Sequence, residues 1–411
     1  MSSHRLNANE HDGVDHREVA NRLDLFHFQD EAPGMVFWHP RGFTLYRLLE
    51  SAARQVLTAQ AYQEIRTPQI LRRPVWDASG HWRHFHEGMF HVQDQAVESA
   101  VKPVSCPGHL YVAGRRAPSY RDLPLRLAEF GVVHRDEPSG TLHGLMRLRQ
   151  FTQDDGHIFC ADDERAEDEV VNFCSALPPF YSAFGFSRLS LALSTRPLER
   201  AGSDEDWDKA EATLLRALSR LGQPYDLQPG QGAFYGPKLE YALHDRMGRQ
   251  WQCGTIQLDL VMPKNFDLHY VDAAGRRRHP VMLHRALYGS LERFMGIVLE
   301  QHGASLPAWL APEQARVLPL SAEQKGEGGR LCMQLRARGV RAQLAHEGSL
   351  SRRIAQAHED GVPVALIVGA RELAQGTVTV RRGNEQNTVP CGEALERVQT
   401  ACASPALVQS S

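Results

Sequence analysis

The segment 133–160 constrains the fold of this chain more than any other, because charged residues recur in it at strand spacing. Side chains on an extended strand alternate between two faces, so residues two apart point the same way. A stretch rich in Pro, Ser and Gly, 138–144, predicts a turn between two strands. The spacing then pairs Arg135 with Glu137 on the first strand. On the returning strand, one face carries Arg147, Arg149, Phe151, Gln153, Asp155 and His157.

This face is charged or amide-bearing almost throughout and has a single aromatic side chain. An ordinary strand of a half-buried sheet alternates apolar and polar residues instead. We interpret the face as a binding surface. A solvated hairpin at the edge of a sheet is the alternative, because antiparallel sheets often expose one polar face.

Length and composition indicate two domains in a cytoplasmic protein. A chain of 411 residues can build more than one core. No apolar run approaches the roughly 20 residues that cross a bilayer, and the polar stretch 1–16 lacks the apolar segment of a signal peptide. Seven cysteines without a Cys-x-x-Cys pair favour a reducing compartment. The net charge of -3 argues against wholesale coating of nucleic acid, although a local basic patch could still bind RNA.

The expected elements change in kind near residue 312. Before it, apolar residues at helical spacing predict helices over 41–61 and 204–221, and alternating residues predict strands over 62–67 and 188–194. After it, strands and helices alternate, which predicts a small parallel or mixed sheet. The segments expected there are 316–320, 329–338, a strand ending at 344, 350–358, 364–368 and 377–380.

One cysteine and two histidines are candidate metal ligands. Cys106 lies between two prolines in K-P-V-S-C-P-G-H, where a rigid turn can hold its sulfur in place. His157 and His284 are isolated among apolar residues, a setting in which a histidine is more often a hydrogen-bonded core residue. Together the three would make a zinc site with one open position. The four histidines within 81–91 lack a recognised ligand spacing, so packing or surface roles are favoured for them.

Three further segments suggest a ligand. The glycine-rich stretch 230–238 allows backbone to approach a ligand closely, but it lacks the order of dinucleotide and phosphate loops, and a structural turn is an equal alternative. The stretch 251–260 predicts a strand with polar groups on both faces. Arg293 lies near the start of the helix that follows residue 281, and a guanidinium suits phosphate recognition.

Eight ordered strings between about residues 15 and 312 resemble motifs one, two and three of class II aminoacyl-tRNA synthetases, and in detail the threonyl-tRNA synthetases. The strings are M-V-F-W-H-P-R-G from Met35, K-P-V-S-C-P-G-H from Lys102, S-Y-R-D-L-P-L-R-L-A-E-F-G from Ser119, H-R-D-E-P-S-G-T-L-H-G-L-M-R from His134, F-T-Q-D-D-G-H-I-F-C from Phe151, A-F-Y-G-P-K from Ala233, W-Q-C-G-T-I-Q-L-D from Trp251 and H-R-A-L-Y-G-S-L-E-R-F from His284.

The resemblance implies an α/β chain with an α+β catalytic domain, an antiparallel sheet flanked by helices, which dimerises through the region of motif one. The expected divisions are a flexible N-terminus (1–14), the catalytic domain (15–312), a small anticodon-binding-like α/β domain (313–402) and a flexible tail (403–411). The last domain is suggested by V-P-V-A-L-I-V-G and R-E-L-A-Q-G-T-V-T-V-R-R, which resemble the anticodon-binding domain of the same enzymes.

The resemblance also implies a role for each site residue. Arg135 and Arg293 would be the catalytic arginines. Binding of ATP with Mg²⁺ would involve Arg135, Glu137, Arg147, Phe151, Gln252, Thr255, Ser290 and Arg293. Threonine would be held by Gln153, Asp155, Tyr235, Lys238 and Gln257, on one Zn²⁺ per subunit ligated by Cys106, His157 and His284.

The implied activity is formation of threonyl-adenylate and transfer of threonine to its tRNA, without an editing domain in the same chain. A separate editing protein is an expected partner. One segment departs from the family: 345–355 reads A-H-E-G-S-L-S-R-R-I-A where relatives read close to R-N-E-K-I-G-Y-K-I-R. Arg352 and Arg353 are expected to remain available for phosphate. Because base-reading residues are replaced, the alternative is a paralogue that activates threonine or another β-hydroxy amino acid for a carrier protein or a different RNA.

Overall fold

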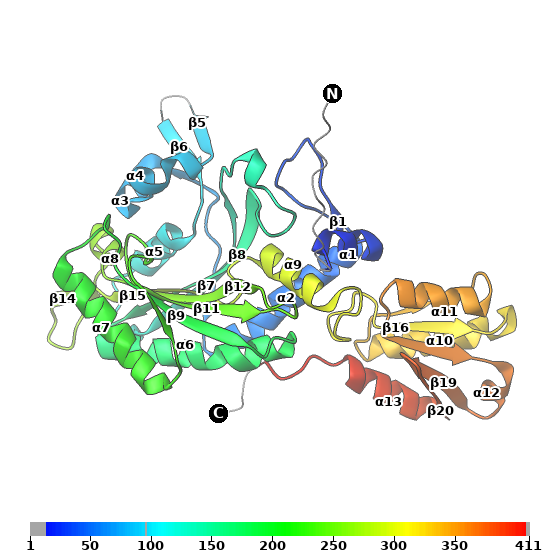
Figure 1. The fold of residues 1–411 in the computed structure, drawn as a ribbon. Helices are drawn as coiled ribbons and strands as arrows, with labels where there is room; N and C mark the ends of the chain where they lie inside the picture. Colours follow the sequence, from blue (N-terminus) through cyan, green and yellow to red (C-terminus); the bar gives the residue numbers. More distant parts are fainter. Residues whose placement is uncertain (1–13, 95–96, 408–411) are drawn as a thin grey trace, which may run out of the picture.

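The computed structural model describes residues 14–94 and 97–407 (Figure 1). Of the two expected flexible ends, 1–13 and 408–411 lie outside the described residues, whereas 403–407 is described and Leu407 is buried. The larger part is built on an eight-stranded sheet in the order β10-β9-β11-β12-β15-β8-β7-β3. The strands are β10 (Asp226–Gln228), β9 (Leu189–Ser194), β11 (Lys238–His244), β12 (Gln250–Asp259), β15 (Val281–Ala286), β8 (Gln150–Cys160), β7 (Leu125–His134) and β3 (Gln63–Glu64). All neighbours are antiparallel except the two edge pairs, β10 with β9 and β3 with β7.

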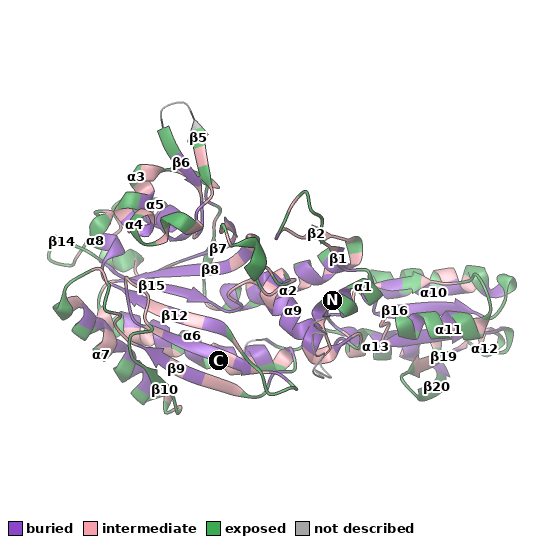
Figure 2. Ribbon diagram, turned by 45° about the horizontal axis from the view of Figure 1, so that its top comes forward, coloured by how far each residue is buried: buried purple, intermediate pink, exposed green. Residues whose placement is uncertain are grey.

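The two faces of this sheet have different coverings. Long helices pack into one large core with one face: α2 (Pro40–Ala59), α6 (Asp163–Ala183), α7 (Asp204–Leu221) and α9 (Leu291–His302), joined by α1 (His16–Leu23). The other face is only partly covered, by α5 (Cys106–Gly114) and α8 (Met262–Asn265). Near α5 lies a small sheet of β4 (Ile70–Arg72), β6 (Val97–Val101) and β5 (His91–Asp94), with the short helices α3 (Arg73–Ser79) and α4 (His81–Phe85). Figure 2 shows the central strands largely buried between these layers.

Strand β8 shows how the sequence sets the two faces. Its even-numbered residues from Thr152 to Ile158 are buried, and Ile158 belongs to the large helical core. Its odd-numbered residues Phe151, Gln153 and Asp155 are half-buried on the other face. The predicted parity is therefore confirmed along β8, and it turns the polar residues toward the open side of the sheet.

The predicted hairpin is shorter than its sequence pattern suggested. Strand β7 ends at His134 and β8 begins at Gln150, so 135–149 is a loop with one 3₁₀ turn at Ser139–Thr141. The N–H of Arg135 still donates to the Arg149 carbonyl, but the N–H of Arg149 donates to Gly34. Backbone groups of the loop therefore pair outside the sheet, and parity does not govern the side chains there.

The second part is a five-stranded mixed sheet with its own core, in the order β17-β16-β18-β19-β20. Its strands are β17 (Ala342–Leu344), β16 (Ala315–Pro319), β18 (Val364–Val368), β19 (Thr377–Arg382) and β20 (Glu385–Pro390). Its helices are α10 (Lys325–Ala337), α11 (Leu350–Glu359), α12 (Ala370–Ala374) and α13 (Cys391–Cys402). The mixed sheet was predicted, whereas α12, β20 and α13 were not. Strand β20 lacks an apolar pattern because it is an edge strand exposed at five of six positions.

Polar contacts tie the two parts together. Arg41 of α2 donates to the carbonyl of Asp360 at 2.7 Å, and its guanidinium lies 3.6 Å from Glu313. Arg22 of α1 donates to the carbonyl of Glu359. Among the described residues, none of the helices is both long enough and apolar enough to cross a membrane.

Candidate functional site

Two adjoining cavities lie on the open face of the large sheet. The larger, of about 570 Å³, is bounded by β8, β12, the 135–149 loop and the start of α9. The smaller, of about 170 Å³, lies toward α5. Five residues line both cavities: Arg135, Gln153, Thr255, Gln257 and Gly289. A ligand in one cavity would therefore lie close to a ligand in the other.

The larger cavity brings together all eight residues that the resemblance assigned to ATP. They come from four separate segments: Arg135, Glu137 and Arg147 from the loop, Phe151 from β8, Gln252 and Thr255 from β12, and Ser290 and Arg293 at the start of α9. Arg149, which the strand pattern placed on the same face, does not line the cavity. It donates to the carbonyl of Glu137 at 2.8 Å and so supports the loop.

Arg135 brings a positive charge between the two cavities. Its Nε donates to the Pro103 carbonyl at 3.3 Å, and its guanidinium carbon lies 5.1 Å from the centre of the Phe151 ring. Within the described residues, no carboxylate lies within 4.0 Å of it. Burial lowers the pKa of this guanidinium, which reflects the cost of removing a cation from water. A bound anion would offset that cost.

A second cationic group stands at the α9 end of the cavity. Ser290 caps the helix by accepting the N–H of Arg293 at 3.2 Å, which fixes where the Arg293 side chain starts. Arg293 Nε and Thr255 Oγ1 are both buried and have no hydrogen-bond partner in the structure. Because buried polar atoms are nearly always paired, two unpaired atoms lining one cavity indicate a polar ligand.

An ion pair closes the outer wall of the cavity. Glu137 and Arg147 lie 2.8 Å apart, across the 135–149 loop. Arg147 is more than half exposed, so this pair contributes little to stability and leaves both groups free to contact a ligand.

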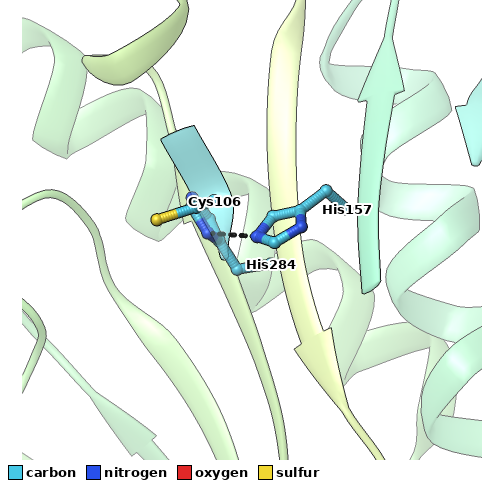
Figure 3. Close-up of side chains that lie close together, drawn as sticks. All are labelled: Cys106, His157 and His284. Carbon is cyan, nitrogen blue, oxygen red and sulfur yellow. Dashed lines mark hydrogen bonds between the residues drawn. The ribbon is translucent and has the colours of Figure 1, made fainter. Parts of the chain in front are cut away.

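Three candidate metal ligands meet at the far end of the smaller cavity. The Sγ of Cys106 and one ring nitrogen each of His157 and His284 all lie within 4.8 Å of one another, and all three residues are buried (Figure 3). The fold explains the meeting: His157 and His284 are direct partners in the β8–β15 ladder, and Cys106 begins α5 above them. Residues 51 and 127 positions apart in the chain are thus joined by sheet register.

Hydrogen bonds on the outer side of each imidazole determine which nitrogen faces the cluster. Asp259 accepts from Nε2 of His284 at 2.9 Å, so Nδ1 of a neutral His284 carries a lone pair. Glu129 accepts from Nε2 of His109 at 3.2 Å, so Nδ1 of His109 accepts from Nδ1 of His157 at 2.9 Å. Nε2 of His157 then also carries a lone pair. The contact drawn in Figure 3 joins this nitrogen to Nδ1 of His284 at 3.0 Å, so two lone pairs face each other. A cation satisfies both.

The electrostatics of the cluster agree with this geometry. Burial, followed by the neighbouring carboxylates Asp155 and Asp259, raises the pKa of the Cys106 thiol well above its ordinary value. Burial and the surrounding imidazoles lower the pKa of His157 well below its ordinary value. Neutral imidazoles and a thiol that needs a cation to ionise are a donor set that fits Zn²⁺.

The residues assigned to the amino acid fall into two groups. Gln153, Asp155, Tyr235 and Gln257 line the smaller cavity beside the Cys and His cluster, and the Tyr235 hydroxyl donates to Gln257 at 2.6 Å. Lys238 lines neither cavity, and its ammonium lies 2.7 Å from Glu240 instead. The histidines within 81–91 that contact aromatic rings include His84, which stacks on Phe234.

Sequence reasoning missed the buried residues that hydrogen-bond to the site residues or to the turn that carries them. Asp154 accepts the backbone N–H groups of Leu287, Tyr288 and Gly289, and so fixes the turn from β15 to α9. Burial raises the pKa of its carboxyl to about 6. Asp259 could have been found, because it has the same strand parity as Thr255 and Gln257. Glu129, Lys102 and His109 carried no such signal.

The second part of the chain has a cavity of about 610 Å³ beside the segment that departs from the family pattern. Arg352 is exposed and lines it, as expected of a residue available for phosphate. Arg353 was expected to be available as well, and that expectation is wrong. It is buried, and its Nη1 donates to the carbonyls of Pro319 and Ala345 at 2.7 and 2.9 Å.

Comparison with known proteins yields two family matches and close relatives. Residues 90–302 match the tRNA synthetase class II core domain (G, H, P, S and T), and residues 314–401 match an anticodon binding domain. A threonine–tRNA ligase of Methylobacillus flagellatus is 48% identical over 390 residues, and one of Bordetella avium is 46% identical over 393. These matches cover 94% and 95% of this chain but only 61% and 60% of the two relatives.

A solved structure agrees over nearly its whole length. It is described as the RNA binding domain of threonyl-tRNA synthetase from Cryptosporidium parvum and is 37% identical, with a TM-score of 0.92. The match covers 95% of this chain and 99% of that one.

Proposed function

The chain belongs to the class II aminoacyl-tRNA synthetases, in the threonyl-tRNA synthetase family, and from this we propose that it activates threonine with ATP and transfers it to threonine tRNA. The observation that carries the proposal is the junction of the two cavities. A cavity with cationic groups at both ends adjoins a Cys and His cluster, and Arg135 lines both.

The larger cavity would hold ATP with Mg²⁺. Phe151 would stack on the adenine, with Glu137 and Arg147 at the adenine and γ-phosphate ends. Arg293 would bind the γ-phosphate, and its unpaired Nε supports a polar partner there. Gln252, Thr255 and Ser290 would border the nucleotide.

The smaller cavity would hold threonine. Cys106, His157 and His284 would bind a zinc ion, which when present supplies a Lewis acid for the amino and hydroxyl groups of the amino acid. Asp155 and Gln153 would orient those two groups, assisted by Tyr235 and Gln257. The threonine carboxylate would then point toward Arg135, between the cavities.

The reaction at this junction needs alignment and charge neutralisation more than a protein nucleophile. The threonine carboxylate would attack the α-phosphorus in line, a new C–O–P linkage would form, and pyrophosphate would leave with the electrons of the broken P–O bond. Arg135 would neutralise the charge on the α-phosphate, and Arg293 that on the leaving pyrophosphate.

The transfer step rests on the family and on the second domain. The match to an anticodon binding domain supports tRNA as the acceptor, and no observation favours the carrier-protein alternative. We retain a homodimer formed through the motif-one region, a cytoplasmic location and a separate editing protein as expectations that go with this proposal.

Pyrophosphate exchange and tRNA charging test the two steps. With zinc and Mg²⁺ present, we expect threonine to drive exchange between labelled pyrophosphate and ATP. Arg293→Gln should reduce this exchange at least a hundredfold, because a phosphate contact made in the transition state is lost. Arg397→Gln, at an exposed position of α13, is the matched control. Exchange without charging of a threonine tRNA transcript would restrict the proposal to the first step, and no exchange at all would overturn it.

A further inference from the structure

We propose that His16 is a positioning residue for the nucleotide cavity: it holds the loop that lines the cavity, so that its loss weakens ATP binding and leaves amino-acid binding unchanged. The inference rests on the proposed ATP-dependent function. His16 is the first residue of α1, which packs against α9 (Figure 1).

Both ring nitrogens of His16 are used. Nδ1 lies 2.7 Å from Oε1 of Glu300, and because a carboxylate only accepts, Nδ1 donates. Nε2 lies 3.0 Å from the backbone nitrogen of Leu145 and accepts its N–H. The imidazole is fully buried and, in this arrangement, neutral. Asp15, His16 and Glu300 are close enough together to suggest a metal site, but the two hydrogen bonds leave His16 no free lone pair.

The loop that His16 holds forms part of the nucleotide cavity. The residues lining the cavity include Leu145, Met146, Arg147 and Leu148. A Cβ on Gly144 would lie 2.1 Å from Nε2 of His16, and Gly144 has a φ of +48°. On α9, a Cβ on Gly296 would lie 3.1 Å from the Met146 side chain. Two glycines therefore allow the loop to lie directly on His16 and α9.

A chain of contacts also connects the His16 imidazole to Trp251, the residue whose ring lies beside the Arg293 guanidinium. The second oxygen of Glu300 accepts from Arg249 at 2.7 Å, and Arg249 pairs with Asp245 at 2.6 Å. Asp245 accepts the indole N–H of Trp251, and the Arg293 guanidinium lies 6.0 Å from the Trp251 ring. A continuous set of polar contacts thus runs from His16 to Trp251, which lies against Arg293.

Two amide substitutions separate the hydrogen bonds of His16. The amide of His16→Asn reaches the position of Nδ1 and keeps the contact with Glu300, whereas that of His16→Gln reaches the position of Nε2 and can accept from Leu145. We expect His16→Asn to weaken ATP binding on the order of tenfold, the effect of one lost hydrogen bond to a backbone N–H, and His16→Gln to stay within about twofold. Glu18→Ala, exposed on the same helix, is the control.

The measurement is calorimetric binding of ATP with Mg²⁺, beside the KM for threonine in pyrophosphate exchange. A role in positioning raises the ATP Kd and leaves the threonine KM unchanged. Equal weakening of both substrates, or equal effects of Asn and Gln, would overturn the inference. If the wild-type protein binds no ATP, the proposed function fails instead, so the two failures are distinguishable.

Gly144→Ala approaches the same contact from the loop. Its methyl group would displace Leu145 from His16, so we expect the same selective loss of ATP affinity. In a His16→Ala background, the added methyl group has room. The loss of ATP affinity in the double variant should therefore be smaller than the sum of the losses in the two single variants. Simple additivity would show that Gly144 acts through its backbone alone and that the loop does not rest on His16.

Discussion

His157 Nε2 and His284 Nδ1 face each other at 3.0 Å, and the outer hydrogen bonds of the two rings leave a lone pair on each. Such an arrangement is unfavourable without a cation, and the thiol of Cys106 completes the donor set. Removal of the sulfur should therefore remove the metal. We expect purified wild-type protein to contain about one zinc per chain by elemental analysis and Cys106→Ser to lose most of it. Cys391→Ser, a half-buried cysteine of the second domain, should keep the wild-type content.

The buried residues behind His157 should determine how tightly zinc binds. Lys102 and Thr67 hold the carboxylate of Glu129, and hydrogen bonds from His109, Lys102 and Thr67 lower its pKa to about 2 against the opposing effect of burial. That fixed charge orients His109, which orients His157. Substituting a residue in this outer shell typically costs ten- to a hundredfold in metal affinity.

We therefore expect Glu129→Gln to raise the zinc dissociation constant by that factor, measured by competition with a chromogenic chelator. Asp267→Asn, on the exposed surface, is the control. An unchanged affinity with unchanged thermal stability would show that His157 is oriented by β8 alone.

Glu292 should make stability depend on pH. Burial raises the pKa of its carboxyl to about 7, although Thr152 and Ser290 hydrogen-bond to it. Between the unfolded pKa of 4.5 and the folded value, the folded chain keeps a proton that the unfolded chain has released, so stability falls as pH rises. The loss is up to about 3 kcal/mol by pH 8.

Glu292→Gln should abolish that part of the pH dependence. We expect urea denaturation to give wild-type and variant similar stabilities near pH 4.5 and a more stable variant at pH 8. Glu199→Gln, at the surface, should reproduce the wild-type profile. A variant that is less stable than wild type at pH 8 would mean that Glu292 is ionised and paired in the folded protein.

Strand parity predicted which side chains of β8 face the site, but it did not place every side chain of the 135–149 loop correctly. Phe151, Gln153, Asp155 and His157 lie on one face of β8, as strand parity required. Arg149 does not, because its N–H pairs with Gly34 and its side chain turns to the Glu137 carbonyl. That His157 lies opposite His284 could not be predicted from alternation within one strand, because it depends on which strands are neighbours in the sheet.

Serine should be the main competing substrate. It keeps the hydroxyl group that Asp155 and the zinc ion are proposed to recognise, and it lacks only a methyl group, whose loss costs about 1–3 kcal/mol. We expect serine to support pyrophosphate exchange with a kcat/KM roughly ten- to two-hundredfold below that of threonine. Valine lacks the hydroxyl, and its activation should be lower by about 10⁴-fold. Comparable activation of valine and serine would exclude recognition through the hydroxyl group.

Arg352 and Arg353 are adjacent in sequence, but their substitution should affect different properties. Loss of Arg352 should weaken tRNA binding, and loss of Arg353 should lower stability. Arg352 is exposed on the cavity beside α11, so Arg352→Ala should raise the KM for tRNA a few-fold, lower the salt dependence of binding by about one phosphate contact, and leave the melting temperature unchanged. Arg353→Ala should instead destabilise the second domain by about 2–3 kcal/mol, because the buried carbonyl of Pro319 and the partly buried carbonyl of Ala345 lose their donor.

Filter binding of threonine tRNA at several salt concentrations, with thermal denaturation of each variant, separates the two effects. Arg371→Ala, exposed on α12 of the same domain, provides the charge-matched control. If Arg352→Ala leaves both the affinity and its salt dependence unchanged, the cavity beside 345–355 is not a tRNA contact. The replaced segment would then have lost this contact to tRNA together with its base-reading residues.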